Sequence, residues 1–208
     1  MITSPARGRD GGPGSLLARG FSVVGLTLVL AIAATIVALA APGYAELQSS
    51  VAIRSAAGEA GAAFFHARSL AISRGRNVGL RFRLVGTRYQ WTVYADGNGN
   101  GIRSADISRG IDFPIASRPW QRNDIRPAIL TGTPVPDPGQ EGAFLDRLSD
   151  PIRFNSSDIC SFSPIGESTP GSIYLWDGRD RMAVIRVFGR SAKIRTLYYR
   201  RGERTWKP

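Results

Sequence analysis

The sequence is poor in the residues that most enzymes and metal sites use. Its 208 residues include one cysteine, Cys160, and one histidine, His66. A single cysteine excludes an intrachain disulfide and a zinc site built on cysteines. A catalytic centre needs a nucleophile, a base and an orienting group, and the spacing of the carboxylates gives no reason to bring any two together. We therefore predict that the chain is not an enzyme and has no cofactor, with calcium the one candidate ion.

Acidic residues are also scarce, with 16 Asp and Glu against 27 Lys and Arg. The formal net charge of +11 suits contact with a polyanion, but it is also typical of a soluble or membrane-facing surface. A chain of this length and apolar content can build one modest core with an appendage. We therefore expect one globular domain.

Charged residues are missing altogether from residues 21–41, which form one apolar run. At about 1.5 Å per residue, a helix of this length covers roughly the 30 Å hydrocarbon layer of a bilayer. The preceding residues carry Arg7, Arg9 and Arg19 against Asp10, and such a positive bias keeps a flank in the cytoplasm. We predict that residues 21–41 span a membrane and that the bulk of the chain lies outside the cytoplasm.

Three kinds of segment would place an apolar run here: a secretory signal peptide, a plain signal anchor and a prepilin leader with its retained helix. Ala38-Leu39-Ala40 fits a signal-peptide cleavage site. The apolar part of a signal peptide is, however, only about 7 to 15 residues long, and the run in this chain is longer. An ordinary secreted or anchored β domain stays open as an alternative, and it would need no cleavage after Gly20.

The boundary around Gly20 resembles the type IV prepilin class. The matching features are a basic leader ending in Gly20, then Phe21, a long apolar helix and Pro42 at the twenty-second position of that helix. The resemblance implies cleavage between Gly20 and Phe21 by a prepilin peptidase on the cytoplasmic face, with N-methylation of Phe21. The retained helix would then pack with the helices of neighbouring subunits.

One residue departs from the prepilin pattern. The class usually has a glutamate at the fifth position of the mature chain, where this sequence has Gly25. In relatives that carboxylate neutralises a neighbouring subunit's terminal amine inside the membrane, where an unpaired charge costs several kcal/mol. Gly25 cannot do this, and we interpret the chain as a minor subunit rather than an abundant, self-polymerising pilin.

A second helical stretch and a hairpin follow the apolar run. Over residues 46–73 a stripe of apolar residues recurs at helical spacing and should pack on a sheet: Ile53, Ala57, Ala60, Phe64, Ala67 and Ala71. Gly75 is a suitable stop for this helix, and Pro42 should bend it rather than end it. Residues 78–84 and 89–93 alternate in polarity around Gly86-Thr87, which predicts a β-hairpin.

The remaining chain predicts a β-rich domain. Residues 96–150 are interpreted as an elaborated loop region with one short strand over 128–131. Short strands are expected over residues 152–154, 159–162, 172–176, 182–188 and 193–199. The fold class is α+β, with a long N-terminal pilin helix packed on an antiparallel β-sheet or β-sandwich. The expected division is a leader (1–20), a transmembrane helix (21–41), its amphipathic continuation (42–75) and a periplasmic β-rich domain (76–208).

Several downstream segments are similar to the GspH/FimT-type minor pseudopilins: Ile152-Arg-Phe154, Phe162-Ser-Pro164-Ile-Gly166, Gly171-Ser-Ile173-Tyr-Leu175, Val187-Phe-Gly189-Arg190 and the helical segment His66-Ala-Arg68-Ser69-Leu70-Ala71. This resemblance implies a minor subunit of the type II secretion pseudopilus, which serves protein export, or of a type IV pilus. The implied location is the inner membrane, crossed once, with the C-terminal domain in the periplasm. The implied partners are other pseudopilin or pilin subunits, the prepilin peptidase, the inner-membrane assembly platform and the lipid bilayer.

A glycine-rich segment starting at Asp96 is a candidate calcium site. Its sequence, Asp96-Gly-Asn98-Gly-Asn100-Gly101, matches the first six positions of an EF-hand-like loop. The twelfth position should carry a bidentate carboxylate but holds Ile107, although the adjacent Asp106 could approach an ion from a differently folded loop. The other interpretation is a tight connection after the preceding strand, in which Asn and Gly tolerate left-handed conformations.

The C-terminal strands concentrate basic side chains next to aromatic ones, which suits phosphate contact and base stacking. The candidates for DNA binding are Arg190, Lys193, Arg195, Arg200 and Arg201. Some pilin-like proteins of the FimT branch bind DNA for uptake through a Gly-Arg-x-Arg motif, and here Gly189-Arg190 is followed by Ser191-Ala192. Because the motif is only half present, DNA binding is the alternative, and a solvated basic face that complements an acidic neighbour is the preferred interpretation.

Overall fold

The computed structural model describes residues 22–122 and 124–208, without the side chain of Pro42. Its long helix, α1 (Val23–Arg74), runs through two compact units, residues 1–44 and residues 45–208. In the described part of the first unit, the side chains of α1 are exposed. By length and composition, α1 contains a segment that is apolar enough to cross a membrane.

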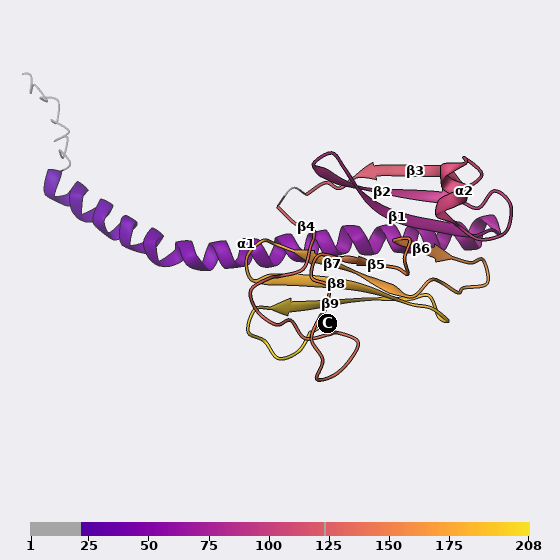
Figure 1. The fold of residues 1–208 in the computed structure, drawn as a ribbon. Coiled ribbons are helices and arrows are strands. Elements are labelled where there is room, and N and C mark those ends of the chain that lie inside the picture. Colours follow the sequence, from indigo (N-terminus) through magenta and orange to yellow (C-terminus); the bar gives the residue numbers. More distant parts are fainter. Residues whose placement is uncertain (1–21, 123) are drawn as a thin grey trace, which may run out of the picture. The chain divides into compact units, whose positions relative to one another are not determined.

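The second unit holds α1 between two antiparallel sheets (Figure 1). One sheet has the strand order β3-β2-β1-β6, formed by β1 (Val78–Val85), β2 (Arg88–Ala95), β3 (Phe113–Pro119) and β6 (Ile159–Phe162). The other has the order β4-β7-β8-β9, with β5 also paired to β7; its strands are β4 (Arg126–Pro127), β5 (Ile152–Arg153), β7 (Gly171–Trp176), β8 (Arg181–Phe188) and β9 (Lys193–Arg200). This arrangement confirms the predicted α+β class with a long helix on antiparallel sheets.

The buried face of α1 is the apolar stripe that the sequence predicts. All six stripe residues are at most 3% exposed, and Ala56 and Ala63 widen the stripe. The Phe64 ring lies 5.7 Å from the Phe82 ring of β1 and 5.5 Å from the Phe154 ring next to β5, measured between ring centroids. Phe64 therefore joins the helix to both sheets at one point of the main core.

The predicted hairpin and helix end are confirmed in the backbone. β1 and β2 pair from Val78 opposite Ala95 to Val85 opposite Arg88, and Gly86 in the turn has a φ of 62°. α1 ends at Arg74, and Gly75 follows with a φ of 61°. A side chain is strained at such positive φ values, whereas glycine is not.

The prediction for residues 96–150 is wrong in three places. The short strand in this region is β4, which precedes residues 128–131, and both the short helix α2 (Ser104–Ser108) and β3 were missed. Ile129 and Leu130 are buried, but they pack on the outer face of the β7–β9 sheet rather than pair in it. β3 is an edge strand that contains two prolines and has no buried residue, so it lacks the polarity alternation of a strand with one buried face.

A second core covers the outer face of the β7–β9 sheet. Tyr174, Met182 and Leu197 from the sheet are buried there against Leu130 and Val135. The C-terminal segment adds the Trp206 ring, whose Nε1 donates a hydrogen bond of 2.7 Å to the carbonyl oxygen of Pro136. Much of the predicted loop region is therefore a lid that buries the second face of this sheet.

Phe64 and Phe65 are adjacent in sequence but differ in burial, at 0% and 54% exposed, and so form a matched pair. We expect Phe64→Ala to lower the free energy of unfolding by about 3–5 kcal/mol, because it leaves a cavity at the contact with both sheets. Phe65→Ala should change the free energy by no more than about 0.5 kcal/mol. Urea unfolding of the detergent-solubilised chain, followed by circular dichroism, measures both values, and equal effects would contradict the packing described above.

Candidate functional site

The predicted processing and assembly positions lie at the start of the chain. Gly20 and Phe21 are outside the described residues. Gly25 is within α1, where an added Cβ would meet nothing within 4 Å, so a larger side chain fits there. The helix continues through Pro42, as predicted, rather than ending there.

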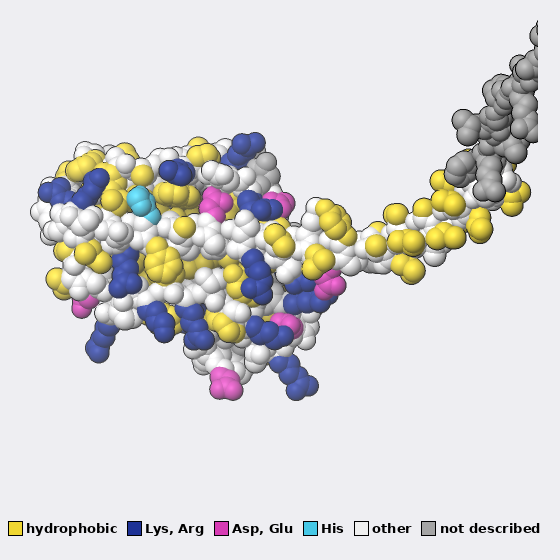
Figure 2. Space-filling view, turned by 180° about the vertical axis from the view of Figure 1, so that it is seen from behind, with side chains coloured by type: hydrophobic (Ala, Val, Ile, Leu, Met, Phe, Trp, Pro, Cys, Tyr) yellow, Lys and Arg dark blue, Asp and Glu magenta, His cyan; other side chains and the backbone are white. Residues whose placement is uncertain are grey.

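In the second unit, the side of α1 that faces away from the core is open. Val51, Phe65 and Ile72 are 66%, 54% and 53% exposed, and they follow one another at multiples of seven residues. Small exposed residues lie between them: Ser55, Gly58, Ala62 and Ser69. Figure 2 shows apolar side chains exposed along the helix, with Lys and Arg side chains on the flanking sheets. Apolar residues at this spacing, with small neighbours, form the kind of face that packs against another helix.

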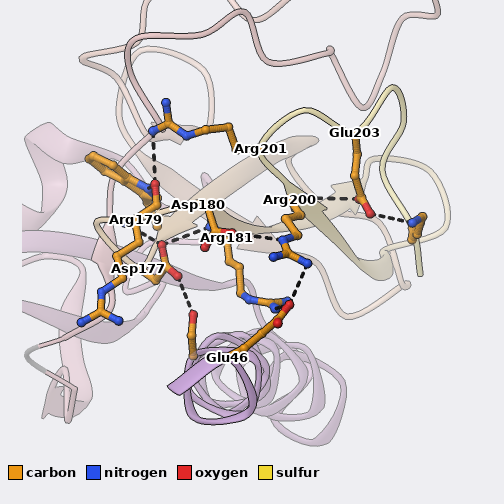
Figure 3. A network of polar contacts seen from close by, with 11 residues as sticks. Glu46, Asp177, Arg179, Asp180, Arg181, Arg200, Arg201 and Glu203 are labelled. Atoms are coloured by element: carbon orange, nitrogen blue, oxygen red, sulfur yellow. Dashed lines mark hydrogen bonds and ion pairs between the residues drawn. The ribbon is translucent and has the colours of Figure 1, made fainter. Parts of the chain in front are cut away.

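A polar network attaches α1 to the sheet of β7, β8 and β9, at the end where β8 begins and β9 ends (Figure 3). One carboxylate oxygen of Glu46, Oε1, lies 3.1 Å from Arg181 Nη2 and 2.7 Å from Arg200 Nη1. The Ser49 hydroxyl, one turn further along α1, donates a 2.7 Å hydrogen bond to Asp177 in the β7–β8 turn. Arg200 Nε also lies 3.1 Å from Asp180 Oδ2. The network therefore fixes both the turn and the edge strand to the helix.

This network uses two of the five residues predicted to bind DNA. Arg200 is held by Glu46 and Asp180, and Arg201 donates a 3.2 Å hydrogen bond to the carbonyl oxygen of Arg179. Sequence reasoning could not detect this, because Glu46 lies on the predicted helix far away in the chain. The charge of Arg200 is thus committed to contacts within the chain.

The other three DNA-binding candidates, Arg190, Lys193 and Arg195, gather at the opposite end of β8 and β9. All three are exposed, and none makes an ion pair with any residue that the structure describes. Arg195 lies directly opposite Arg186, a like-charge pair that leaves this end of the sheet basic. Ala192, at the place of the second arginine of the Gly-Arg-x-Arg motif, is fully buried. A motif arginine would therefore not fit this turn.

The Asp96 segment folds around its own carboxylate. Asp96 is 2% exposed, and its oxygens accept backbone hydrogen bonds from Asn98, Gly99 and Gly101 at 3.1, 2.7 and 2.8 Å. The side-chain amide of Asn77 donates a fourth bond at 2.8 Å. Burial by itself raises the pKa of Asp96, but the bonds from Asn77 and from the backbone outweigh it and hold the pKa below the usual value.

The other candidate calcium ligands join the same segment through hydrogen bonds. Asn98 Oδ1 accepts a bond of 3.2 Å from the Asn100 backbone, and the Asn100 amide donates a bond of 3.2 Å to Asp106, which is buried. Asp112, which was not among the predicted ligands, also joins the segment: its carboxylate accepts hydrogen bonds from the backbone N–H groups of Gly97 and Arg103 at 3.2 and 2.9 Å. Asp112 lies beyond the twelve positions of the EF-hand-like pattern, so the spacing of that pattern gave no signal for it.

These contacts bring the four predicted ligands into one loop without making a metal cage. No group of three or more His, Cys, Asp or Glu side chains is placed to hold a metal ion in the described part of the chain. A side chain at position 97 would collide with the backbone of Ile111, so glycine is required there by close approach. Carboxylate-to-backbone hydrogen bonds thus account for the loop, and calcium binding stays a prediction.

The single cysteine and the single histidine lie in different environments. Cys160 is fully buried, and this burial strongly raises the pKa of its thiol, so the reactive thiolate is not formed near neutral pH. Its Sγ lies 3.7 Å from the carbonyl oxygen of Thr169. His66 is exposed on α1. These positions give Cys160 the role of a core residue.

The comparisons with known proteins point to one family. A family model described as type II transport protein GspH matches residues 56–189, which is more than half of the chain. The matched span begins inside α1 and ends just after β8, so it contains both sheets except for β9. No curated protein and no solved structure matches the chain significantly.

Asp96→Asn tests the role of the buried carboxylate, because it keeps the size of the side chain and removes the charge. We expect the free energy of unfolding at pH 7 to fall by about 1–3 kcal/mol. The lowered pKa means that this stabilisation is present above the pKa of an unfolded Asp, about 3.9, and is lost as the pH falls through the folded-state pKa. The difference between wild type and Asp96→Asn in urea unfolding should therefore shrink below about pH 4.

Glu141→Gln is the matched control, since Glu141 is exposed and makes no ion pair with a described residue. A stability difference between wild type and Asp96→Asn that stays constant down to pH 2 would contradict the role of the ionised carboxylate.

The same proteins test the calcium prediction by calorimetry. Heat of calcium binding that Asp96→Asn abolishes would support the site, and an absence of heat in wild type would exclude it.

Proposed function

The chain belongs to the GspH family of type II transport proteins, and from this we propose that it is a minor pseudopilin of a type II secretion pseudopilus, used in protein export. In this proposal the subunit is inserted in the inner membrane with its C-terminal domain in the periplasm. A prepilin peptidase cleaves it between Gly20 and Phe21 and the new terminus is methylated. The inner-membrane assembly platform then moves the subunit into a filament of other pseudopilins.

The observation that carries this proposal is the open face of α1. In the second unit one side of the helix builds the core, while Val51, Phe65 and Ile72 on the other side face solvent. Burial of exposed apolar surface is favourable, so this face is stabilised when it meets the helix of another subunit. The solvent-facing side of a surface helix typically carries polar residues instead.

The apolar part of α1 supports the membrane stage of the proposal. It is long and apolar enough to cross a bilayer, and its exposed side chains in the first unit are those that lipid would surround. Gly25 has no carboxylate to neutralise the terminal amine of a neighbour. A subunit of this kind suits a position that is occupied once or a few times in a filament, where that pairing is not repeated.

The contacts of Glu46 suit a subunit that is pulled out of a membrane by its helix. A load on α1 reaches the β domain through the core stripe and through the ion pairs from Glu46 to Arg181 and Arg200. Ser49 adds a further contact to the β7–β8 turn. The helix and the sheet are thereby connected at the start of the second unit as well as along its core.

A minor pilin of a type IV pilus that binds DNA for uptake is the second candidate. It is favoured only by the basic end formed by Arg190, Lys193 and Arg195. Arg200 and Arg201 are engaged within the chain, and Ala192 replaces the second motif arginine in a buried position. The pseudopilin role is therefore better supported.

Mass spectrometry of the protein from a host that contains a prepilin peptidase tests the processing step. We expect an N-terminus at Phe21 that carries a methyl group. Replacing Gly20 by a bulky residue, Gly20→Leu, should leave the leader attached, because it removes the glycine with which the leader ends in the prepilin pattern. An N-terminus near Ala41, or an intact Met1 in the wild type, would contradict the proposal and support the secreted or anchored β domain.

Charge placed on the open face of α1 tests assembly. Phe65→Lys should lower the amount of subunit in sheared pseudopili by about tenfold or more, because a buried, unpaired ammonium group opposes helix packing. Phe144→Lys is the matched control: Phe144 is 62% exposed on the lid over the β7–β9 sheet and should not change incorporation. Equal incorporation of both variants would contradict the role of this face. In the same assay, Gly25→Glu tests the interpretation that Gly25 marks a minor subunit, and unchanged incorporation would contradict that interpretation.

A further inference from the structure

A cavity of about 780 Å³ opens between the two sheets at the β1–β2 turn. Its walls come from this turn, from the segment that leads into β4 and from the loop before β5. The volume lies within the range of roughly 300–1,000 Å³ that is typical of ligand-binding pockets. The cavity is separate from the open face of α1, so a role for it goes beyond the assembly proposed above.

The charged residues that line this cavity are all cationic. Three arginines line it, Arg88, Arg122 and Arg126, and none of its lining residues is Asp or Glu. Arg122 forms a bidentate pair with Asp124: its Nε donates a hydrogen bond of 3.1 Å to Oδ1, and its Nη2 donates one of 2.8 Å to Oδ2. Arg88 and Arg126 are exposed and form no ion pair with any residue in the described ranges. Two guanidinium groups are thus available to an anionic partner.

Neutral donors and apolar walls complete the lining. Burial is the largest effect on Tyr89 and raises the pKa of its phenol, which Arg126 partly opposes, so the hydroxyl keeps its proton near neutral pH. The Ser149 hydroxyl also lies in the wall. Leu84 and Leu148 line the cavity while remaining 57% and 38% exposed, which leaves apolar surface at its mouth.

We propose that this cavity binds an acidic segment of a partner protein, with carboxylates at Arg88 and Arg126 and an aliphatic side chain against Leu84 and Leu148. Guanidinium groups bind carboxylates through strong, directed hydrogen bonds. Inorganic phosphate would use the arginines but not the apolar wall. A membrane surface would meet the exposed hairpin tip but would not enter a recess. The mixture of cationic and apolar lining therefore fits an acidic, aliphatic peptide best.

The test uses the full chain in detergent and a fluorescent ten-residue peptide in which Glu and Leu alternate. Fluorescence anisotropy should show saturable binding, and the same peptide with Gln in place of Glu should bind about tenfold more weakly or not at all. Arg88→Gln/Arg126→Gln should weaken binding of the acidic peptide by about tenfold or more. Arg74→Gln/Arg109→Gln removes the same charge from exposed arginines outside the cavity and should change binding by no more than about twofold.

Charge reversal keeps the proposal testable should a neutral variant lose its fold. Arg88→Glu/Arg126→Glu should bind a peptide of alternating Lys and Leu and lose the acidic one, while circular dichroism reports the fold of each variant. Four results would overturn the proposal: no binding by wild type, equal binding of the Gln peptide, equal weakening by both neutral double variants, or no gain of the Lys peptide. Displacement of the peptide by equimolar inorganic phosphate, DNA or anionic phospholipid vesicles would also overturn it in favour of phosphate recognition.

Discussion

The packing of one alanine-rich side of α1 against two sheets is the contact on which the second unit depends. Alanine is the best helix former and has the smallest side chain that still buries apolar surface. A row of alanines thus keeps the helix intact and lets the strands of both sheets approach its backbone. Phe64 then fills the space where the two sheets come together with the helix. One consequence is that the helix has a buried side and a bare side, and the bare side is the one available to other subunits.

The sheet of β7, β8 and β9 has a second requirement, because both of its faces are apolar. Ile173, Ala183 and Ile185 point to the core with α1, whereas Tyr174, Met182 and Val184 point away from it. Burying only one face would leave aromatic and aliphatic side chains in water. The long segment between β3 and β5 meets this requirement by folding across the outer face, and the C-terminal Trp206 closes one side of it. The segment therefore stabilises the sheet, although its composition is that of a loop.

The features that the sequence predicts well have a short-range cause. The stripe from Ile53 to Ala71, the hairpin at Gly86 and the strands after residue 150 follow from periods of 3.6 or 2 residues and from turn chemistry. What was missed depends on contacts between distant segments. The two-sided burial of the last sheet, the pairing of Glu46 with Arg200 and the place of Asp112 beside Gly97 are all of this kind. For the same reason, a count of basic residues could not tell that Arg200 and Arg201 are already engaged within the chain.

Internal pairing also decides where the net positive charge of the protein is free to act. Several of the few carboxylates are engaged within the chain: Asp96 and Asp112 accept hydrogen bonds from backbone N–H groups of a loop, and Glu46 pairs with two arginines where α1 enters the second unit. A carboxylate used in this way does not balance the arginines elsewhere on the surface. The excess of positive charge therefore remains on cations without an ion pair among the described residues, such as Arg190 and Lys193 on the sheet and Arg88 and Arg126 in the cavity. At the exposed end of β8 and β9, positive charge offers a partner only long-range attraction, which salt screens. In a recess with apolar walls, as at Arg88 and Arg126, the same charge also fixes the orientation of a partner and the recess fits its shape, and specific recognition requires both.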